Sequence, residues 1–253
     1  MIDQEVIVFS ATRTGSTFIW QCLNELFETV HKIHPSSHLL RKKADFQSLS
    51  KLLRKGLPCV IVERDPVESF LSKLRVDISL NGDSAKKFIQ CIKLDMDKFV
   101  GTTEGLKQFY PYINSYLIEL MNIQHVKNNY KGKILPLDYN NFFNNYNYIF
   151  EKFESFFEMQ IPSEVKDRIV EKTNLGANKK IQNQFKDFNS YCEKSHIHGE
   201  HILSGEPDFY KPTISETNYS KLRSLLSNDK NERDEFLKTL GLTKVGEDVL
   251  IEL

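Results

Sequence analysis

One stretch near the N-terminus constrains the fold more than any other: an apolar run that ends in a loop of small residues and opens into an amphipathic helix. The run covers residues 6–9, the loop covers residues 10–15, and the helix follows Gly15. Such a loop points several backbone N–H groups at one place, and the helix N-terminus adds partial positive charge there. The stretch therefore predicts a buried strand whose end carries a site for an anion such as phosphate.

The loop departs from the common phosphate-binding pattern G-x-x-x-x-G-K-[ST]. Its two glycine positions hold Ser10 and Gly15. The last two positions hold Ser16, in place of the lysine, and Thr17. The cation is instead Arg13, which lies inside the loop. This change argues against an ordinary ATPase or GTPase, because those proteins contact the phosphates with the missing lysine.

A second segment repeats the order of strand, charge and helix. Residues 59–62 are apolar and begin a predicted strand that ends at Glu63. Arg64 follows, and a proline stands in the first turn of the predicted helix. Ser72 comes about two helical turns after Arg64, so the guanidinium and the hydroxyl can converge on one anion. In the alternative interpretation, Arg64 only caps the helix or pairs with Asp65 or Glu68.

These two segments resemble the motifs of sulfotransferases that use 3'-phosphoadenosine 5'-phosphosulfate (PAPS). The loop is similar to the family's 5'-phosphosulfate loop, Pro-Lys-Ser-Gly-Thr-Thr-Trp, and the second segment to its 3'-phosphate motif, Arg-x-Pro with a downstream Ser. The resemblance implies that the 5'-phosphate is held by four consecutive residues, Thr14, Gly15, Ser16 and Thr17. It also implies that Arg64 and Ser72 select the 3'-phosphate.

Three further positions take roles from this resemblance. Arg13 stands where the family has lysine and would stabilise charge on the bridging oxygen, but it cannot donate its proton at neutral pH. Phe18 stands at the adenine-stacking tryptophan, while Trp20 falls on another helix face. The strand at 133–138 runs into Tyr139, which resembles the tyrosine of the family's Tyr-Glu-Asp-Leu motif and would lie near the adenine.

Residues 30–35, Val-His-Lys-Ile-His-Pro, resemble the Lys-Thr-His-Leu-Pro strand of the cytosolic sulfotransferases. The resemblance makes His34 the candidate general base, because a histidine can accept the acceptor's proton near neutral pH. Lys32 is two residues away and therefore on the same face of a strand, so the two can act together. Two alternatives are a histidine without a catalytic role and a carboxylate base, as in relatives that act on carbohydrates or protein tyrosines.

Along the whole chain, predicted strands near 5–10, 29–34, 59–63 and 133–138 alternate with helical stretches. This alternation predicts an α/β fold: a single domain, 1–253, with a P-loop-type parallel β-sheet flanked by helices on both faces. Residues 84–130 predict extra helices over the acceptor site.

The composition of the chain limits the kinds of binding partner that we expect. Lys and Arg together number 34, as do Asp and Glu, so no broad field for nucleic acid is expected and any anion site is local. The four cysteines lack metal-like spacing, and neither a leader nor a membrane-spanning apolar run is evident. These features predict a cytoplasmic protein without a membrane anchor. The resemblance implies a small-molecule, glycan or lipid acceptor.

The resemblance implies an in-line attack of an acceptor O–H or N–H on the sulfur of PAPS, with 3'-phosphoadenosine 5'-phosphate (PAP) as leaving group and no metal required. Two other classes stay open: a kinase that uses ATP and Mg²⁺ bound by Asp138, and a nucleotide-binding module without catalysis. Residues 195–207 suit a loop that closes the site, although their histidines and carboxylates also allow a zinc interpretation.

Overall fold

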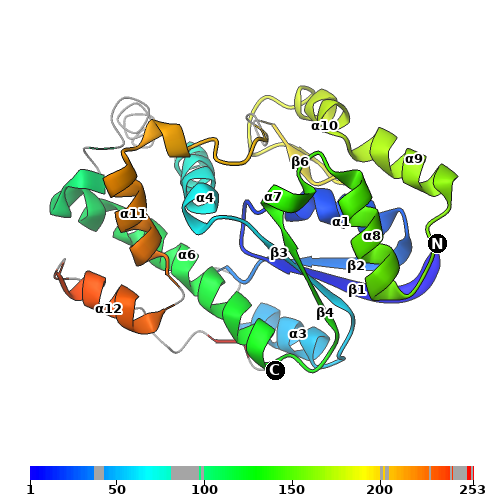
Figure 1. Ribbon diagram of the computed structural model, residues 1–253, viewed down its shortest axis with the longest axis horizontal. Coiled ribbons are helices and arrows are strands. Elements are labelled where there is room, and N and C mark those ends of the chain that lie inside the picture. The colour runs from blue at the N-terminus through cyan, green and yellow to red at the C-terminus, as the bar shows by residue number, and fades with distance from the viewer. Residues whose placement is uncertain are drawn as a thin grey trace.

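A computed structural model of the protein describes residues 1–36, 43–80, 97, 100–199, 202, 205–227, 229–239, 241, 250, 251 and 253. Four parallel strands form the central sheet in the order β2-β1-β3-β4 (Figure 1). Their bounds are β1 Ile2–Ser10, β2 Phe27–Ile33, β3 Cys59–Glu63 and β4 Ile134–Asp138. All four predicted strands are therefore confirmed.

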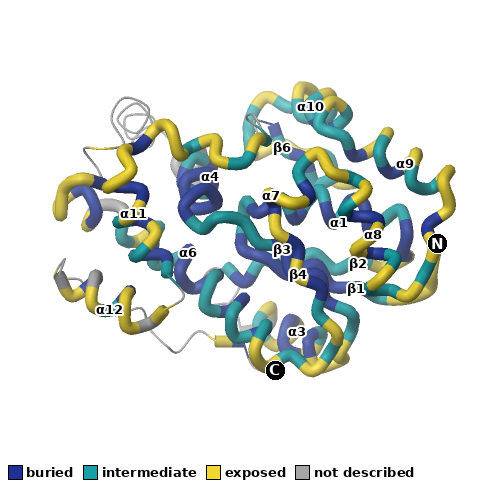
Figure 2. Tube along the Cα trace, in the orientation of Figure 1, coloured by how far each residue is buried: buried dark blue, intermediate teal, exposed yellow. Residues whose placement is uncertain are grey.

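The sheet is buried on both faces because its strands are apolar on both faces. Successive residues of β1 point to opposite sides. Val6 and Val8 belong to one hydrophobic core, whereas Ile7 and Phe9 belong to the other. Figure 2 shows the resulting band of buried residues across the sheet. This two-sided burial is typical of parallel sheets, and it confirms the predicted layers.

Helices cover each face. The core that contains Val6 is closed by α1 Ser16–Asn24, α7 Tyr139–Phe142, α8 Tyr146–Phe157 and α9 Ser163–Thr173, with α10 Leu175–Gln182 beside them. The core that contains Ile7 is closed by α3 Lys43–Leu53, α4 Pro66–Leu80, α6 Thr103–Asn129, α11 Glu216–Leu225 and α12 Lys230–Thr239. Of the predicted helices in 84–130, α6 is described; residues 84–96, 98 and 99 lie outside the described residues.

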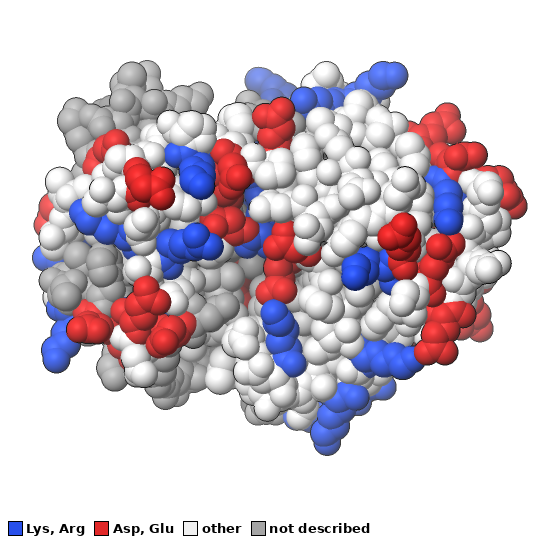
Figure 3. Space-filling model, in the orientation of Figure 1, with Lys and Arg blue, Asp and Glu red and all other residues white. Residues whose placement is uncertain are grey.

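Two smaller elements complete the chain. A hairpin of β5 Tyr191–Cys192 and β6 Ile197–His198 follows α10, and a short helical turn at Lys211–Thr213 precedes α11. None of the helices in the described ranges combines the length and apolar composition that a bilayer crossing requires. On the face drawn in Figure 3, basic and acidic side chains are interspersed, in keeping with the balanced charge of the chain.

The strand order fixes where a ligand can bind. The chain passes from β1 to β2 in one direction along the sheet and from β3 to β4 in the other. In open α/β sheets, ligands bind at the carboxyl ends of the strands where this direction changes, here between β1 and β3. The loops that begin at Ser10 and Arg64 therefore flank the expected crevice.

Candidate active site

A cavity of about 540 Å³ lies at the carboxyl ends of β1 and β3, within the usual size range of small-molecule sites. Its lining includes almost every residue that the sequence singled out: Arg13, Gly15, Ser16, Thr17, Phe18, Lys32, His34, Arg64, Ser72 and Tyr139. Thr14 is the exception, since it is buried behind the loop and its hydroxyl donates to the Ala11 carbonyl at 3.1 Å. Thr14 is therefore not part of the lining of this cavity.

The phosphate loop owes its shape to two residues in the left-handed region. Arg13 has φ 69° and Gly15 has φ 87°. Gly15 stands at the N-cap of α1 and makes no side-chain cap bond. A Cβ at Gly15 would lie 2.7 Å from the ring of Tyr139. Glycine is therefore required here for its backbone conformation and for the close approach of the loop to Tyr139.

Arg13 is held at the side of the loop that faces the cavity. Its Nε donates to Ser72 Oγ at 3.1 Å, and its guanidinium lies 5.8 Å from the centroid of the Phe188 ring. Burial, with the charge of Arg75 as a further cause, lowers the pKa of Arg13 to about 10. Arg13 thus stays charged at neutral pH, and Ser72 orients it in addition to facing the cavity.

Arg64 is packed against Tyr139, with its guanidinium carbon 4.5 Å from the ring centroid. Its Nη2 donates to Glu68 Oε2 at 3.4 Å and to the Glu206 carbonyl at 3.2 Å. Its side chain is only 9 % exposed, and its Nε has no hydrogen-bond partner among the described residues. The pairing with Glu68 that the sequence left open is therefore present, but it uses only part of the guanidinium.

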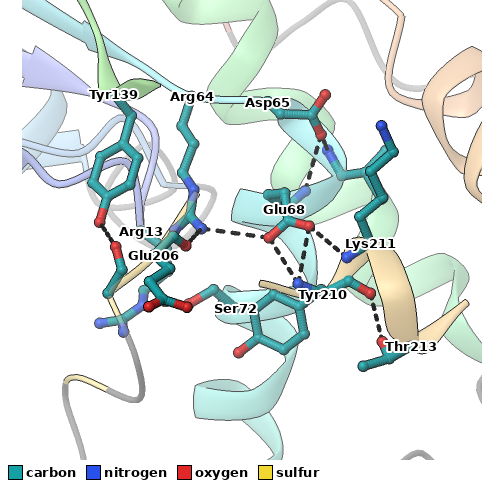
Figure 4. Close-up of polar contacts among 12 residues, drawn as sticks. Arg13, Arg64, Asp65, Glu68, Ser72, Tyr139, Glu206, Tyr210, Lys211 and Thr213 are labelled. Atoms are coloured by element: carbon teal, nitrogen blue, oxygen red, sulfur yellow. Dashed lines mark hydrogen bonds and ion pairs between the residues drawn. The ribbon is translucent and has the colours of Figure 1, made fainter. Parts of the chain in front are cut away.

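A segment that we call the strap, residues 205–211, lies across this end of the cavity (Figure 4). Glu68, which is 1 % exposed, accepts hydrogen bonds from the backbone of Tyr210 at 3.0 Å and of Lys211 at 2.7 Å. Burial raises the pKa of Glu68. The hydroxyl of Tyr139 donates to the Gly205 carbonyl. The strap thus includes the end of the predicted closing loop, residues 195–207. Its Glu206 carbonyl accepts a hydrogen bond from Arg64.

One wall of the cavity is aromatic. Phe18 stacks on Phe142 with ring centroids 6.0 Å apart and meets Tyr146 edge-on at 5.5 Å. Trp20 does not share this position: its indole donates to the Val30 carbonyl at 2.9 Å, as expected for another helix face. This wall offers flat apolar surfaces for a base.

Three residues that the sequence did not single out lie at the same end: Thr173, Leu175 and Asn178. Asn178 is buried, and its side-chain amide exchanges hydrogen bonds with that of Gln21 at 3.1 and 3.2 Å. Thr173, Leu175 and Asn178 lie where α9 ends and α10 begins. Asn174 caps α10 at this boundary. The sequence signals a helix start there, but nothing local connects it with the phosphate loop.

Lys32 on β2 and His34, the residue that follows this strand, both line the cavity. His34 Nδ1 lies 3.0 Å from the Ser10 carbonyl, which can only accept, so Nδ1–H donates and the neutral ring keeps its lone pair on Nε2. Burial, with the nearby Lys32, lowers the pKa of His34 to about 4. Lys32 Nζ donates to Thr17 Oγ1 at 2.9 Å, and burial lowers its pKa to about 8.

The hairpin brings two more histidines to the cavity. His198 stacks on Phe188 with centroids 4.3 Å apart, and His196 contacts the Trp20 ring at 4.4 Å. His198 Nδ1 donates to the Phe188 carbonyl. Among the residues that the structure describes, no three His, Cys, Asp or Glu side chains are placed to hold a metal. His201, the third histidine of the zinc interpretation, lies outside the described residues.

Asp138, the metal ligand that a kinase would need, lies behind the phosphate loop. Its carboxylate accepts from Asn140 N at 2.8 Å and caps α7. It lines a separate cavity of about 370 Å³ together with Glu63 and Asp65. This position and its capping role argue against a Mg²⁺ site in the main cavity.

Neither a protein-family model nor a curated protein matches this chain. Among solved structures, mouse sulfotransferase SULT7A1 complexed with PAP is 10 % identical, with 94 % of this chain and 90 % of that chain covered and a TM-score of 0.56. Retinol dehydratase in complex with androsterone and inactive cofactor PAP is 14 % identical over 95 % and 82 % of the chains, with a TM-score of 0.47. At such identities the first likeness establishes architecture alone: this chain has the fold of the mouse sulfotransferase.

Proposed function

We propose that the protein transfers a sulfuryl group from PAPS to a hydroxyl or amine of an acceptor. The observation that carries this proposal is that two arginines from different strand ends, Arg13 and Arg64, face one cavity with an aromatic wall. Their charges repel each other, since Arg64 helps to lower the pKa of Arg13. A nucleotide with phosphates at two separate positions would place a negative charge beside each arginine. The mouse sulfotransferase with the same fold was crystallised with such a nucleotide, PAP.

The residues around the cavity suit the parts of this nucleotide. The backbone of residues 14–17 would hold the 5'-phosphate at the N-terminus of α1. Arg64, with its unused Nε, and Ser72 would hold the 3'-phosphate. Phe18 would stack on the adenine, and Tyr139 would lie near it. A site for the 3'-phosphate would also favour this nucleotide over ATP, because ATP has no 3'-phosphate.

The same residues account for the chemistry. PAPS supplies the sulfuryl group and carries the leaving group. His34 Nε2 would accept the proton of the attacking hydroxyl, in the tautomer that the Ser10 carbonyl fixes. Arg13 and Lys32 would neutralise charge that develops on the bridging oxygen. Because these two cations contribute to lowering the pKa of His34, an anion bound between them raises it and makes His34 a stronger base.

The proposal also covers the cellular compartment and the class of acceptor. We place it in the cytoplasm, because Cys22, Cys59 and Cys192 are free thiols and therefore suit a reducing compartment. The acceptor would be a small molecule, a glycan or a lipid.

The test is a calorimetric titration of PAP, ADP and ATP, each with and without Mg²⁺. We expect tight, metal-independent binding of PAP that weakens by roughly thirtyfold or more in Arg64→Ala, since this change removes a nearly buried charge from its anion. The matched control is Arg223→Ala, whose side chain is 67 % exposed and 3.9 Å from Asp65. Preference for ATP with Mg²⁺ would instead favour the kinase.

Turnover separates an enzyme from a binding module. PAPS would be incubated with phenols, amines, sugars and lipid alcohols, and the release of PAP followed. We expect release with one acceptor class and its loss in His34→Gln, which cannot accept a proton. Tight PAP binding without release for any acceptor would favour the non-catalytic module.

A further inference from the structure

A carboxylate far away in the sequence contacts the phosphate loop. Glu119 lies on α6, is 0 % exposed, and accepts from Thr12 N at 2.7 Å and from Thr12 Oγ1 at 2.9 Å. The two residues are 107 positions apart in the chain. Burial strengthens these hydrogen bonds, because the local dielectric constant is low. Glu119 therefore fixes both the backbone and the side chain of Thr12.

Thr12 directly precedes the strained residue of the loop. Arg13 has φ 69°, a conformation that is unfavourable for a non-glycine residue and persists only where the surroundings impose it. Two contacts impose it here. Glu119 holds the residue before Arg13, and Ser72 accepts from the Arg13 side chain at 3.1 Å.

The identity of residue 12 explains why such a contact is needed. In the sulfotransferase motif that the loop resembles, Pro-Lys-Ser-Gly-Thr-Thr-Trp, proline stands where this chain has Thr12. A proline fixes its own φ and has no N–H to satisfy. A threonine leaves the backbone freer and brings an N–H and a hydroxyl that need partners when they are partly buried. One oxygen of Glu119, Oε2, accepts from both donors.

We propose that Glu119 is a positioning residue that holds the phosphate loop in its anion-binding conformation, taking the place of a proline in the loop. The proposal rests on the proposed function in one respect: the anion is the 5'-phosphate of the PAPS nucleotide. Glu119 acts through Thr12 and Arg13, while Arg64 and the strap belong to the other end of the cavity.

The test uses three probes with wild type and Glu119→Leu: PAP, adenosine 5'-phosphate and adenosine 3'-phosphate. Removing Glu119 leaves the donors of Thr12 without their acceptor and releases Arg13 from its conformation. We expect binding of PAP and adenosine 5'-phosphate to weaken roughly tenfold. Binding of adenosine 3'-phosphate should change less than twofold, because Arg64 is untouched.

Two variants separate this role from a general loss of stability. Asn122→Leu removes a neighbouring buried polar group of α6, which accepts from Ile251 N at 2.8 Å. It should lower the melting temperature without changing any of the three affinities. Glu119→Gln keeps an oxygen for Thr12, and it should retain most of the affinity for adenosine 5'-phosphate.

The strongest test is rescue. In Glu119→Leu/Thr12→Pro the orphaned N–H and hydroxyl are absent and the ring fixes φ, so we expect affinity for adenosine 5'-phosphate to return to within about threefold of wild type. An unchanged affinity in Glu119→Leu, equal weakening of all three probes, or no rescue would each overturn the proposal. If the wild-type protein binds no PAP at all, the proposed function is wrong. That result differs from the three outcomes above, which concern Glu119 alone.

Discussion

The two ends of the cavity are built in different ways. The phosphate loop is one short segment in which Arg13 and Gly15 have positive φ, and Glu119 supports it from outside. The Arg64 end takes its shape from distant segments: the Arg64 contact to the Glu206 carbonyl spans 142 positions of the chain. The first end can therefore be recognised from a short motif, whereas the second exists only once the strap has folded back over β3 and α4 (Figure 4).

The largest effect should come from breaking the locally built end. In Gly15→Ala, the new Cβ would meet the Tyr139 ring at 2.7 Å, and the backbone would remain strained at φ 87°. We expect PAP binding to weaken by roughly a hundredfold or more and the free energy of unfolding to fall by about 3 kcal/mol. Calorimetry and urea unfolding measure the two quantities.

Gly56→Ala is the matched control for this change. Gly56 has φ 67°, and a Cβ there would meet nothing within 4 Å. It should cost only the backbone strain, about 1 kcal/mol, and leave PAP binding unchanged. Equal effects of the two substitutions on stability and on binding would show that the approach to Tyr139 does not matter.

The same contrast explains what the sequence could predict. The four strands and the helix after Gly15 were predicted because apolar periodicity is a local property, and the strand ends converge in any parallel sheet. Arg13 was found because it lies in the loop that follows β1, and Arg64 because it directly follows β3. Glu119 was missed, since its role depends on a contact across 107 positions. Leu175 was missed for a similar reason: it reaches the cavity only through the packing of α9 and α10.

Removing the buried carboxylate under the strap should break the other end. Glu68→Ala leaves the N–H groups of Tyr210 and Lys211 without their acceptor, which should cost about 1–3 kcal/mol of stability. We expect hydrogen exchange at these two amides to become faster while exchange in the phosphate loop stays unchanged. Glu63→Ala, which breaks an ion pair with Lys127 at 2.9 Å, is the control and should leave the strap protected. Unchanged exchange in Glu68→Ala would mean that other contacts hold the strap.

A smaller effect should appear as pH dependence at His34. Its pKa is lowered from 6.5 to about 4, so the folded chain binds this proton only at lower pH than the unfolded chain. Stability should therefore fall as pH drops from about 6.5 to 4, by about 1–2 kcal/mol after allowance for partial exposure. His34→Gln should remove this part of the fall. Equal pH dependence in the variant and in wild type would show that other groups cause it.

Nuclear magnetic resonance can test whether an anion restores the basicity of His34. PAP placed between Lys32 and Arg13 should raise the pKa of His34 by about one unit or more, because it offsets the two nearby positive charges. The His34→Gln spectrum assigns the signal. A pKa that is unchanged at saturating PAP would place the nucleotide away from these cations and would separate His34 from the phosphate loop.

The smallest effect should come from enlarging the aromatic wall. Phe18 stands at the tryptophan position of the resembled motif and stacks on Phe142 at 6.0 Å. Phe18→Trp offers a wider surface to the base, so we expect PAP to bind about two- to fivefold more tightly, whereas Phe18→Ala should weaken it by roughly tenfold. Because base stacking does not depend on the phosphates, adenosine should show the same ratios. A gain seen with PAP but not with adenosine would mean that the substitution reshapes the adjoining phosphate loop. The loop would then depend on contacts outside its own segment, as the Arg64 end does.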